Sequence, residues 1–509
     1  MTSVFKHIAS FLSYSENSPL IFTEGSFWIF FTILLAGYSF VYRTNFLRSL
    51  YLLIFSLFFY YKSSGYFFFL LIFSTVCDYV LGLLISKSQI HWKRKLYVAI
   101  SVFINLSVLS FFKYSYFFAD SLNSLLGTKY EAFNFLAHWA NLLVGSNFDV
   151  ASIVLPVGIS FFTFQTISYT VDVFRRKVKP VTNIIDFGFY VSFFPQLVAG
   201  PIVRAAEFIP QLYRKYNLSQ REFGYALFLI LNGLIKKIVI SDYISLNFVD
   251  RVFASPLSFS GFENLLATYG YSIQIYCDFS GYTDMATGLA LLLGFRLPIN
   301  FNSPYKALNI TDFWHRWHIS LSSWLRDYLY IPLGGNRKGK VMTYVNLMVT
   351  MLLGGLWHGA NIRFVVWGAI HGVSLALHKL WMQLFPHHRF RSSWWKRFLT
   401  AFFTFHLVCL SWIFFRGESM SMALDMIRQI GTRFGWQSVW EVLASYVPVL
   451  SLMAIAYAVH WFPVKWKEFY RGTFINSNIV AKLAIALLVA IIIFQTKSAE
   501  LQPFIYFRF

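Results

Sequence analysis

Charged residues are scarce in this chain of 509 residues, because aspartate, glutamate, lysine and arginine together make up only 13% of it. A soluble globular domain carries about 25% of such residues, so the composition excludes an ordinary soluble enzyme or binding module. Hydrophobic residues make up 57% of the chain. Mostly apolar runs of about 18 residues or more recur, as membrane-spanning helices require. We therefore predict an all-α polytopic membrane protein.

Cysteine is almost absent. The three cysteines, Cys77, Cys277 and Cys409, lie within apolar runs, and no two of them have the spacing of a redox or zinc motif. This pattern excludes a disulfide framework. Nothing in the sequence predicts a metal site, and no bound cofactor is expected.

Acidic residues are also few, since 22 aspartates and glutamates face 43 lysines and arginines, for a formal net charge of +21. In a soluble protein such an excess is typical of nucleic-acid binding. In a membrane protein basic residues collect in the cytoplasmic loops, so we expect membrane lipid and no nucleic acid as partner. A cleavable signal peptide is not predicted, because the first long apolar run starts near Phe27 without the short core and small-residue cleavage site of such a signal.

Long apolar runs predict about eleven or twelve membrane segments. One shorter run, about 186–200, is broken by Pro195 and by Gly200-Pro201, which favours a re-entrant segment over a full span. The remaining runs lie at about 27–42, 47–62, 66–86, 97–119, 150–171, 223–245, 263–294, 342–358, 363–385, 399–416, 444–462 and 478–495.

The basic loops predict the orientation of these segments. All the basic clusters fall on one side, the cytoplasm, if the N-terminus lies outside and the segment near 186–200 is re-entrant. The loops around 120–149, 250–262 and 417–443 and the C-terminus then lie outside. No repeat of fixed period is present, so we predict one membrane domain over 1–509. The clusters are Arg43/Arg48, Lys87–Lys95, Arg175–Lys179, Arg214–Arg221, Arg337–Lys340, Arg389–Arg397 and Lys465–Arg471.

The stretch Asp312–Gly359 places ionisable side chains beside and within apolar runs. His315 and His318 are three residues apart, so on a continuous helix they would share a face. His358 lies within the next apolar run, beyond a basic turn. Ionisable groups inside a membrane are costly and mark functional sites. A lone histidine is more often a structural hydrogen-bonding residue, but this combination predicts a site.

A neutral imidazole is suited to proton transfer with a hydroxyl near neutral pH. Burial keeps a histidine neutral, so His318 and His358 are candidate catalytic residues. Three glycines near His358, namely Gly354, Gly355 and Gly359, allow close approach by a helix or by a ligand.

Two aspartates interrupt another apolar run. Asp278 and Asp284 must be paired or hydrogen-bonded if they are buried. We interpret them as structural rather than catalytic, with Arg296 or Arg326 as candidate partners. The neighbouring Asp327 is a candidate to orient the imidazole of His318, because a carboxylate on one ring nitrogen fixes the tautomer.

Four stretches resemble the membrane-bound O-acyltransferases of the bacterial type that includes the alginate O-acetylation and teichoic acid D-alanyl transfer proteins. They are FFPQLVAGPIVR at 193–204, YCDFSGYTDMA at 276–286, WHISLSSWLRDYLYIPLGG at 317–335 and LGGLWHGA at 353–360. The resemblance covers about 150–420. It implies a ring of helices around a thin centre with a tunnel or paired funnels, and His318 and His358 as the active-site pair.

The resemblance also implies the reaction. A cytoplasmic thioester, acetyl-CoA or an acyl carrier protein, would donate the acyl group. A hydroxyl of an extracytoplasmic polysaccharide would accept it, directly or through a periplasmic partner similar to SGNH hydrolases. The location would be a bacterial inner membrane. Basic or polar residues on the predicted cytoplasmic side are candidates for donor binding, although each also fits the ordinary cytoplasmic charge bias; they are Arg204, His315, Arg326, Asp327, Arg337 and Lys338.

The C-terminal segment 502–509 carries four aromatic residues within its last six. Such residues are typical of an interfacial belt. The segment also resembles the aromatic C-terminal motif of the small partner subunit in teichoic acid D-alanylation, which makes Tyr506 a candidate acyl relay. A phenol with its ordinary pKa of about 10 needs a base for this role.

Two other functions stay open at this point. A transporter, for example a flippase for lipid-linked sugars, also buries ionisable groups and breaks helices in the membrane, although no internal repeat supports it. A lipid- or protein-modifying acyltransferase of the same superfamily shares the LWHG-type histidine, but the WHISLS block favours the polysaccharide branch.

Overall fold

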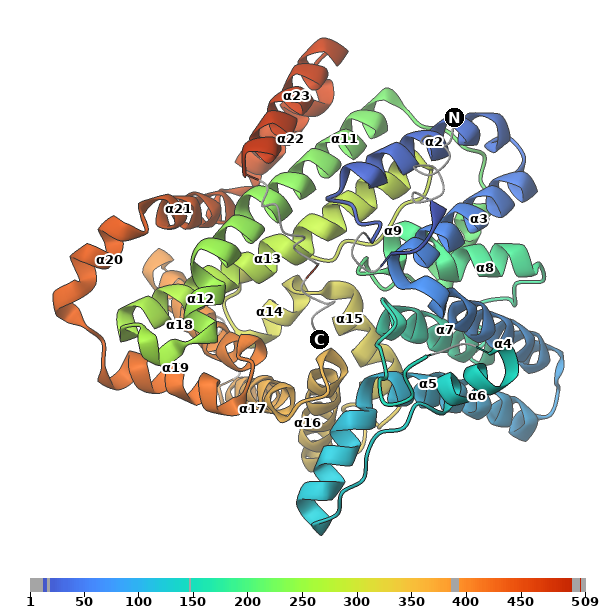
Figure 1. The fold of residues 1–509 in the computed structure, drawn as a ribbon, viewed down its shortest axis with the longest axis horizontal. Coiled ribbons are helices and arrows are strands. Elements are labelled where there is room, and N and C mark those ends of the chain that lie inside the picture. The colour runs from blue at the N-terminus through green and yellow to red at the C-terminus, as the bar shows by residue number, and fades with distance from the viewer. Residues whose placement is uncertain (1–11, 16–18, 146–147, 386–392, 497–503, 505–509) are drawn as a thin grey trace. The chain divides into compact units, whose positions relative to one another are not determined.

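A computed structural model describes residues 12–15, 19–145, 148–385, 393–496 and 504. Within these residues every regular element is helical (Figure 1). The chain divides into two compact units, Met1–Val198 with Ile202–Tyr216, and Ala199–Pro201 with Asn217–Phe509. The prediction of an all-α protein is confirmed. That of a single domain stays a prediction.

The first unit packs long and short apolar helices against one another through aromatic and small polar side chains. Tyr60, Phe187 and Tyr190 are fully buried in it. A buried carboxylate, Asp78, accepts hydrogen bonds from Ser101 and Asn105, which satisfy its polar oxygens in an apolar interior. The helices are α2 (Gly25–Val41), α3 (Asn45–Ser64), α4 (Phe68–Lys87), α5 (His91–Leu126), α6 (Phe135–Val144), α7 (Ile159–Phe174), α8 (Ile184–Ser192), α9 (Phe194–Leu197) and α10 (Ala205–Leu212).

The second unit contains the stretch that the sequence singles out. Its helices are α11 (Gln220–Leu234), two π-helical segments η2 (Ile235–Asp242) and η3 (Ser245–Val249), α12 (Asp250–Ala254), α13 (Gly261–Leu292), α14 (Ile310–Arg316), α15 (Ile319–Trp324), the π-helical η6 (Leu325–Tyr330), α16 (Gly339–His358), α17 (Ile362–Leu384), α18 (Trp394–Arg416), α19 (Met420–Thr432), α20 (Val439–Ser445), α21 (Val447–Trp461), α22 (Val464–Asn476) and α23 (Ile479–Thr496).

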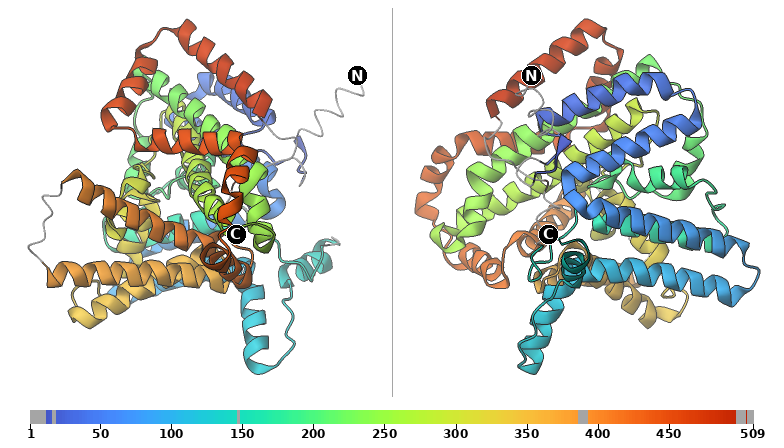
Figure 2. Two further views of the ribbon diagram at one scale, coloured as in Figure 1. Left: turned by 90° about the vertical axis from the view of Figure 1, so that its left-hand side faces the viewer. Right: turned by 45° about the vertical axis from the view of Figure 1, so that its right-hand side comes forward.

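Helices α11 and α13 form the central pair of this unit and run side by side (Figures 1 and 2). Both begin with a capping box, in which Ser219 or Ser260 bonds the first turn and a glutamate three residues later bonds back. Gly233 and Gly281 face each other, and a Cβ on Gly233 would lie 2.5 Å from the Gly281 carbonyl oxygen. The pair can therefore approach this closely only without side chains at these positions.

Six helices in the described residues are long and apolar enough to cross a membrane, and a bent pair, Trp436–Ser445 with Val447–Trp461, would add a seventh. The chain is a multi-pass membrane protein, as predicted. The segment near 186–200 forms α8 and α9, of 9 and 4 residues, which are too short to span about 30 Å of hydrocarbon. The ring with a central tunnel stays a prediction.

Candidate active site

The candidate site begins at a break in the chain between α14 and α15. His318 has a φ of +41° and lies in the left-handed region, which costs a residue with a side chain about 1–3 kcal/mol and recurs at functional sites. The break turns His315 and His318 apart, since His315 is exposed whereas His318 is fully buried. The prediction that the two histidines share one helix face is therefore wrong, because the helix on which it depends ends at Arg316.

An extended segment pairs with this break and holds His318. The Asn300 backbone carbonyl accepts a hydrogen bond from the Ile319 N–H at 3.0 Å. The side-chain oxygen of Asn300 accepts from the Ser320 N–H at 3.1 Å and from the Ser320 hydroxyl at 2.9 Å. The same oxygen lies 3.2 Å from Nδ1 of His318. Asn300 lies in a segment without regular periodicity, so no pattern in the sequence marks it as a functional residue.

His358 is the last residue of α16, and close packing against α17 fixes its position. A Cβ on Gly355 would lie 2.2 Å from the carbonyl oxygen of Phe364, and one on Gly359 would meet the Phe364 ring at 2.0 Å. The predicted close approach at these glycines is thus made by a neighbouring helix. The third glycine, Gly354, faces Leu325 instead.

The indole of Trp357 joins the two histidines. Its ring centroid lies 6.3 Å from that of His318 and 4.9 Å from that of His358. The distance between the two imidazole centroids therefore cannot exceed the sum of these two distances. Phe279 of α13 packs its ring at 4.6 Å from His318. The structure brings together the two residues predicted as the catalytic pair, in one buried aromatic cluster of the second unit.

The aromatic surroundings keep His318 neutral. His318 lies outside the helices that qualify as membrane spans, and burial lowers its pKa to about 3. The charged imidazolium loses its hydration in such a site, so the ring holds one proton at neutral pH. Around His358, the rings of Trp367 and Phe415 pack at 5.1 and 5.2 Å.

A third buried histidine, His371, lies in the same cluster, although no motif of the sequence marks it. Its ring packs 4.7 Å from that of Trp367. Nε2 of His371 lies 3.0 Å from the Ser411 hydroxyl, and this hydroxyl donates to the Val408 carbonyl. Nε2 therefore donates to Ser411, and the contact links α17 to α18 as a structural hydrogen bond.

The two aspartates of α13 are paired, as predicted, but with different partners, and only Asp278 is buried. Asp278 lies 2.5 Å from Nζ of Lys237 and Asp284 lies 2.7 Å from Nζ of Lys236. Arg296 instead pairs with Glu222 at the start of α11. The prediction of Arg296 or Arg326 as the partner is wrong, because two adjacent lysines, Lys236 and Lys237, face α13. The signal was present in the sequence, since two lysines interrupt the apolar run 223–245.

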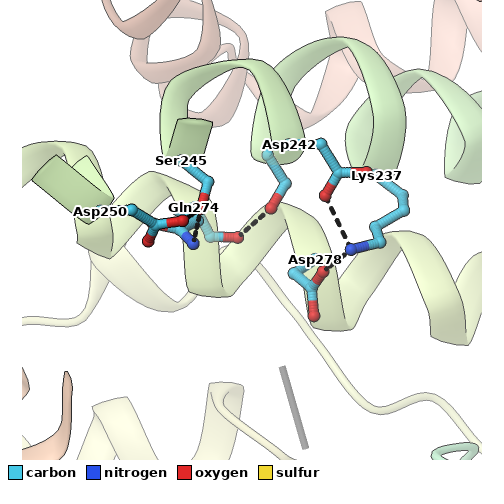
Figure 3. Close-up of polar contacts among 7 residues, drawn as sticks. Lys237, Asp242, Ser245, Asp250, Gln274 and Asp278 are labelled. Atoms are coloured by element: carbon cyan, nitrogen blue, oxygen red, sulfur yellow. Dashed lines mark hydrogen bonds and ion pairs between the residues drawn. The ribbon is translucent and has the colours of Figure 1, made fainter. Parts of the chain in front are cut away.

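Lys237 and its partners form one of two neighbouring polar groups between η2, η3 and α13 (Figure 3). Lys237 also bonds Asp242 at 2.7 Å. Gln274 donates to Ser245, which donates to Asp250 (Figure 3). Wide π-helical turns are frequent at functional sites. Here they carry Lys237, Asp242 and Ser245, whose polar groups form ion pairs and hydrogen bonds within the unit.

The predicted donor-binding residues of the second unit lie mostly on its surface. Arg326 pairs with Asp327 at 2.7 Å, and the contact on Nδ1 of His318 comes from Asn300. The prediction that Asp327 orients this imidazole is therefore corrected.

The basic turn after η6 is exposed. Arg337 and Lys338 are both exposed there. Lys379 of α17 adds a third cation, since its Nζ bonds Asn336 at 2.8 Å. It lies in an apolar run far along the chain from the turn, so no motif of the sequence marks it.

Two predicted residues lie elsewhere. Arg204 belongs to the first unit, where it is the N-cap residue of α10. Tyr506 lies outside the described residues, so its relay role stays a prediction. The nearest described residue of the tail, Phe504, is buried with its ring 5.6 Å from Phe279 and 5.0 Å from Tyr282. Among the described residues no cluster of histidine, cysteine, aspartate or glutamate has the arrangement of a metal site.

Comparison with known proteins adds to this geometry. A model of the membrane-bound O-acyltransferase family matches residues 89–421. A peptidoglycan O-acetyltransferase of Helicobacter pylori is 36% identical over 406 residues, which cover 75% of this chain and 73% of that protein. A probable alginate O-acetylase AlgI of Pseudomonas putida is 36% identical over 458 residues, or 86% and 89% of the two chains. A teichoic acid D-alanyltransferase of Bacillus subtilis is 28% identical over 274 residues, or 52% and 69%.

Proposed function

Because the chain belongs to the membrane-bound O-acyltransferase family, we propose that it moves an acyl group from a cytoplasmic thioester to a hydroxyl on an extracytoplasmic polysaccharide. Acetyl is the acyl group that fits best, since the more similar relatives are named for O-acetylation of peptidoglycan and alginate. Transfer is direct or passes through a periplasmic acetyltransferase similar to SGNH hydrolases. The protein then resides in a bacterial inner membrane with both termini outside.

One observation carries this proposal: His318 and His358 contact the same indole, that of Trp357, inside an aromatic cluster. Both histidines are buried, at 0% and 3% exposure. Trp357 and His358 are neighbours in the chain, so the contact of Trp357 with His318 is the one by which the fold brings two separate stretches of the sequence, each with a candidate histidine, to one place. The buried surroundings also strengthen every polar interaction made there.

The chemistry follows from neutral imidazoles. An unprotonated ring nitrogen takes the proton of the acceptor hydroxyl, whose oxygen bonds to the thioester carbonyl carbon. The carbon–sulfur bond then breaks, and the imidazolium returns the proton to the departing thiolate. We assign the general-base role to His358 and an assisting role to His318. The oxyanion formed on the carbonyl needs hydrogen-bond donors, for which the indoles of the cluster are candidates.

The cytoplasmic donor is acetyl-CoA or an acyl carrier protein, both of which present phosphate. The exposed cations of the basic turn, Arg337 and Lys338, with Lys379 of α17, support this choice, because guanidinium and ammonium groups bind phosphate well. A lipid-linked sugar transporter, the competing function, has no need for thioester cleavage.

The test uses the purified full chain in lipid nanodiscs with acetyl-CoA labelled in the acetyl group. We expect thiol release, and transfer of label to alginate or peptidoglycan fragments when the matching periplasmic acetyltransferase is added. His358→Ala should lower thioester cleavage by about 10²–10⁴-fold, the usual contribution of a general base, and His318→Ala should also lower it.

His138→Ala is the matched control, because this histidine is exposed on α6 of the first unit; it should keep full activity. A carrier-protein thioester replaces acetyl-CoA in a parallel reaction to identify the donor. Full thioester cleavage by His358→Ala, or sugar-lipid transport without any thioester use, would refute the proposed function.

A further inference from the structure

We propose that Asn300 is a positioning residue that fixes the tautomer of His318, so that Nδ1 carries the proton and Nε2 presents its lone pair to the reaction. The inference rests on the proposed function for the role of Nε2, but the tautomer itself follows from hydrogen bonding around Asn300. Asn300 is 1% exposed, and His318 is fully buried, so water does not compete for these contacts.

The orientation of the Asn300 amide is set by the backbone. The Ser320 N–H, 3.1 Å from the side-chain oxygen of Asn300, can only donate. The group that faces it must therefore be the carbonyl oxygen, because a flipped amide would place NH₂ against N–H. The Ser320 hydroxyl, at 2.9 Å from the same oxygen, fits this assignment by donating as well.

The assignment carries over to the imidazole. The Asn300 oxygen can only accept, and it lies 3.2 Å from Nδ1 of His318, so Nδ1 must be the donor. Burial lowers the pKa of His318 to about 3, and a neutral ring carries only one proton. Nε2 therefore keeps its lone pair and can accept a hydrogen bond or a proton, as the assisting role requires.

The backbone holds both partners in register. The Asn300 carbonyl accepts from Ile319, directly after His318, and the Asn302 N–H donates to the Arg316 carbonyl at 2.9 Å. These two bonds lie on either side of the left-handed residue His318. The two bonds hold His318 in its strained conformation. This conformation places Nδ1 of His318 against the side chain of Asn300.

The experiment is ¹⁵N NMR of the full chain labelled at histidine side chains, in lipid nanodiscs. His318 is assigned as the signal that His318→Gln removes. In the wild-type protein we expect a protonated Nδ1 and an unprotonated Nε2. Asn300→Ala should shift the ring toward the other tautomer or a mixture, and Asn300→Asp should retain the wild-type tautomer, because a carboxylate also accepts from Nδ1–H.

Kinetics add a readout that a purely structural role would not produce. Asn300→Ala should lower the kcat of acyl transfer by about 10²-fold with little change in KM, since the assisting imidazole of His318 loses its correct tautomer but no substrate contact is removed. Asn300→Asp should stay within about tenfold of wild type. Asn302→Ala, an exposed position of the same segment, should keep both the tautomer and kcat.

A wild-type His318 with its proton on Nε2 would overturn the proposal, as would an Asn300→Ala protein that keeps both the tautomer and kcat. If Asn300→Ala does not fold, the wild-type and Asn300→Asp spectra still decide. If the tautomers change as expected but His318→Gln keeps full activity, the positioning by Asn300 stands and the catalytic role of His318 fails.

Discussion

At the scale of single residues, the polar atoms of the site are set by groups with fixed hydrogen-bonding roles. A backbone N–H orients Asn300, Asn300 orients His318, and a buried environment leaves the ring neutral. His371 shows the same logic with a different result, because its Nε2 donates to Ser411 and so makes an interhelical bond. Two buried histidines of one unit are thus distinguished by what faces each nitrogen.

The neutral state of His318 predicts a pH dependence of stability. The pKa of this group falls from 6.5 to about 3 on folding, so the unfolded chain binds more protons between these values. Stability is therefore fully present above about pH 6.5 and is lost as the pH falls from there toward 3. Melting temperatures of the purified protein should fall between about pH 8 and about pH 5, and less so for His318→Gln.

The comparison concerns the slope with pH and not the absolute melting temperature, which His318→Gln also changes. The exposed variant His138→Gln should keep the wild-type slope. Equal slopes in wild type and His318→Gln would show that His318 does not change its protonation on folding.

At the scale of elements, the pairing of α11 and α13 combines small residues with buried charge. Gly233 and Gly281 allow backbone contact, and two ion pairs lie beside them. The side chains of Lys237 and Asp278 are 6% and 4% exposed, whereas those of Lys236 and Asp284 are 20% and 22% exposed. A buried pair adds little net stability by itself, but removal of one partner leaves an uncompensated charge.

Lys237→Met should therefore destabilise the protein by about 3–5 kcal/mol, because Asp278 and Asp242 lose the cation between them. Lys236→Met is the matched control on the adjacent residue. It should cost much less, since water still reaches its partner Asp284. Thermal unfolding in detergent, followed by the fraction of monodisperse protein, measures both; equal losses in the two variants would contradict this account.

At the scale of the whole molecule, the orientation follows from charge. The basic turn that contains Arg337 is predicted to be cytoplasmic, and the loop that contains Glu441 is predicted to be extracytoplasmic, from the loop charges alone. Both residues are exposed, so both are accessible to a reagent on the correct side of the membrane.

Single-cysteine labelling checks this orientation. In a chain with its three native cysteines replaced by alanine, Glu441→Cys should react with a membrane-impermeant maleimide in intact spheroplasts. Arg337→Cys should react only after the membrane is permeabilised, because the bilayer excludes the reagent. The reverse pattern would invert the predicted topology and place the basic turn away from the cytoplasmic thioester.

Much of the fold could be predicted because a segment in lipid finds no water to bond its backbone N–H and C=O groups. A single apolar segment satisfies these groups only as a helix, so long apolar runs become helices. The predicted runs at about 47–62 and 342–358 correspond to α3 and α16. More apolar runs were predicted to span the membrane than there are helices, in the described residues, that are long and apolar enough to do so. Helix α13, for example, carries Glu263, Asp278 and Asp284, and its acids are satisfied by partners that only the packed unit supplies.

The sequence by itself determined the helical membrane class and the family, and it predicted the two candidate histidines, because composition, apolar length and contiguous motifs are local properties of a chain. Only the tertiary structure decided the partners: Asn300 for His318, Trp357 between the imidazoles, and Lys237 for Asp278. Hydrogen-bond roles depend on which atoms meet in space. The break at His318, which separates it from His315, arises from pairing with a segment that lies 18 residues earlier in the chain.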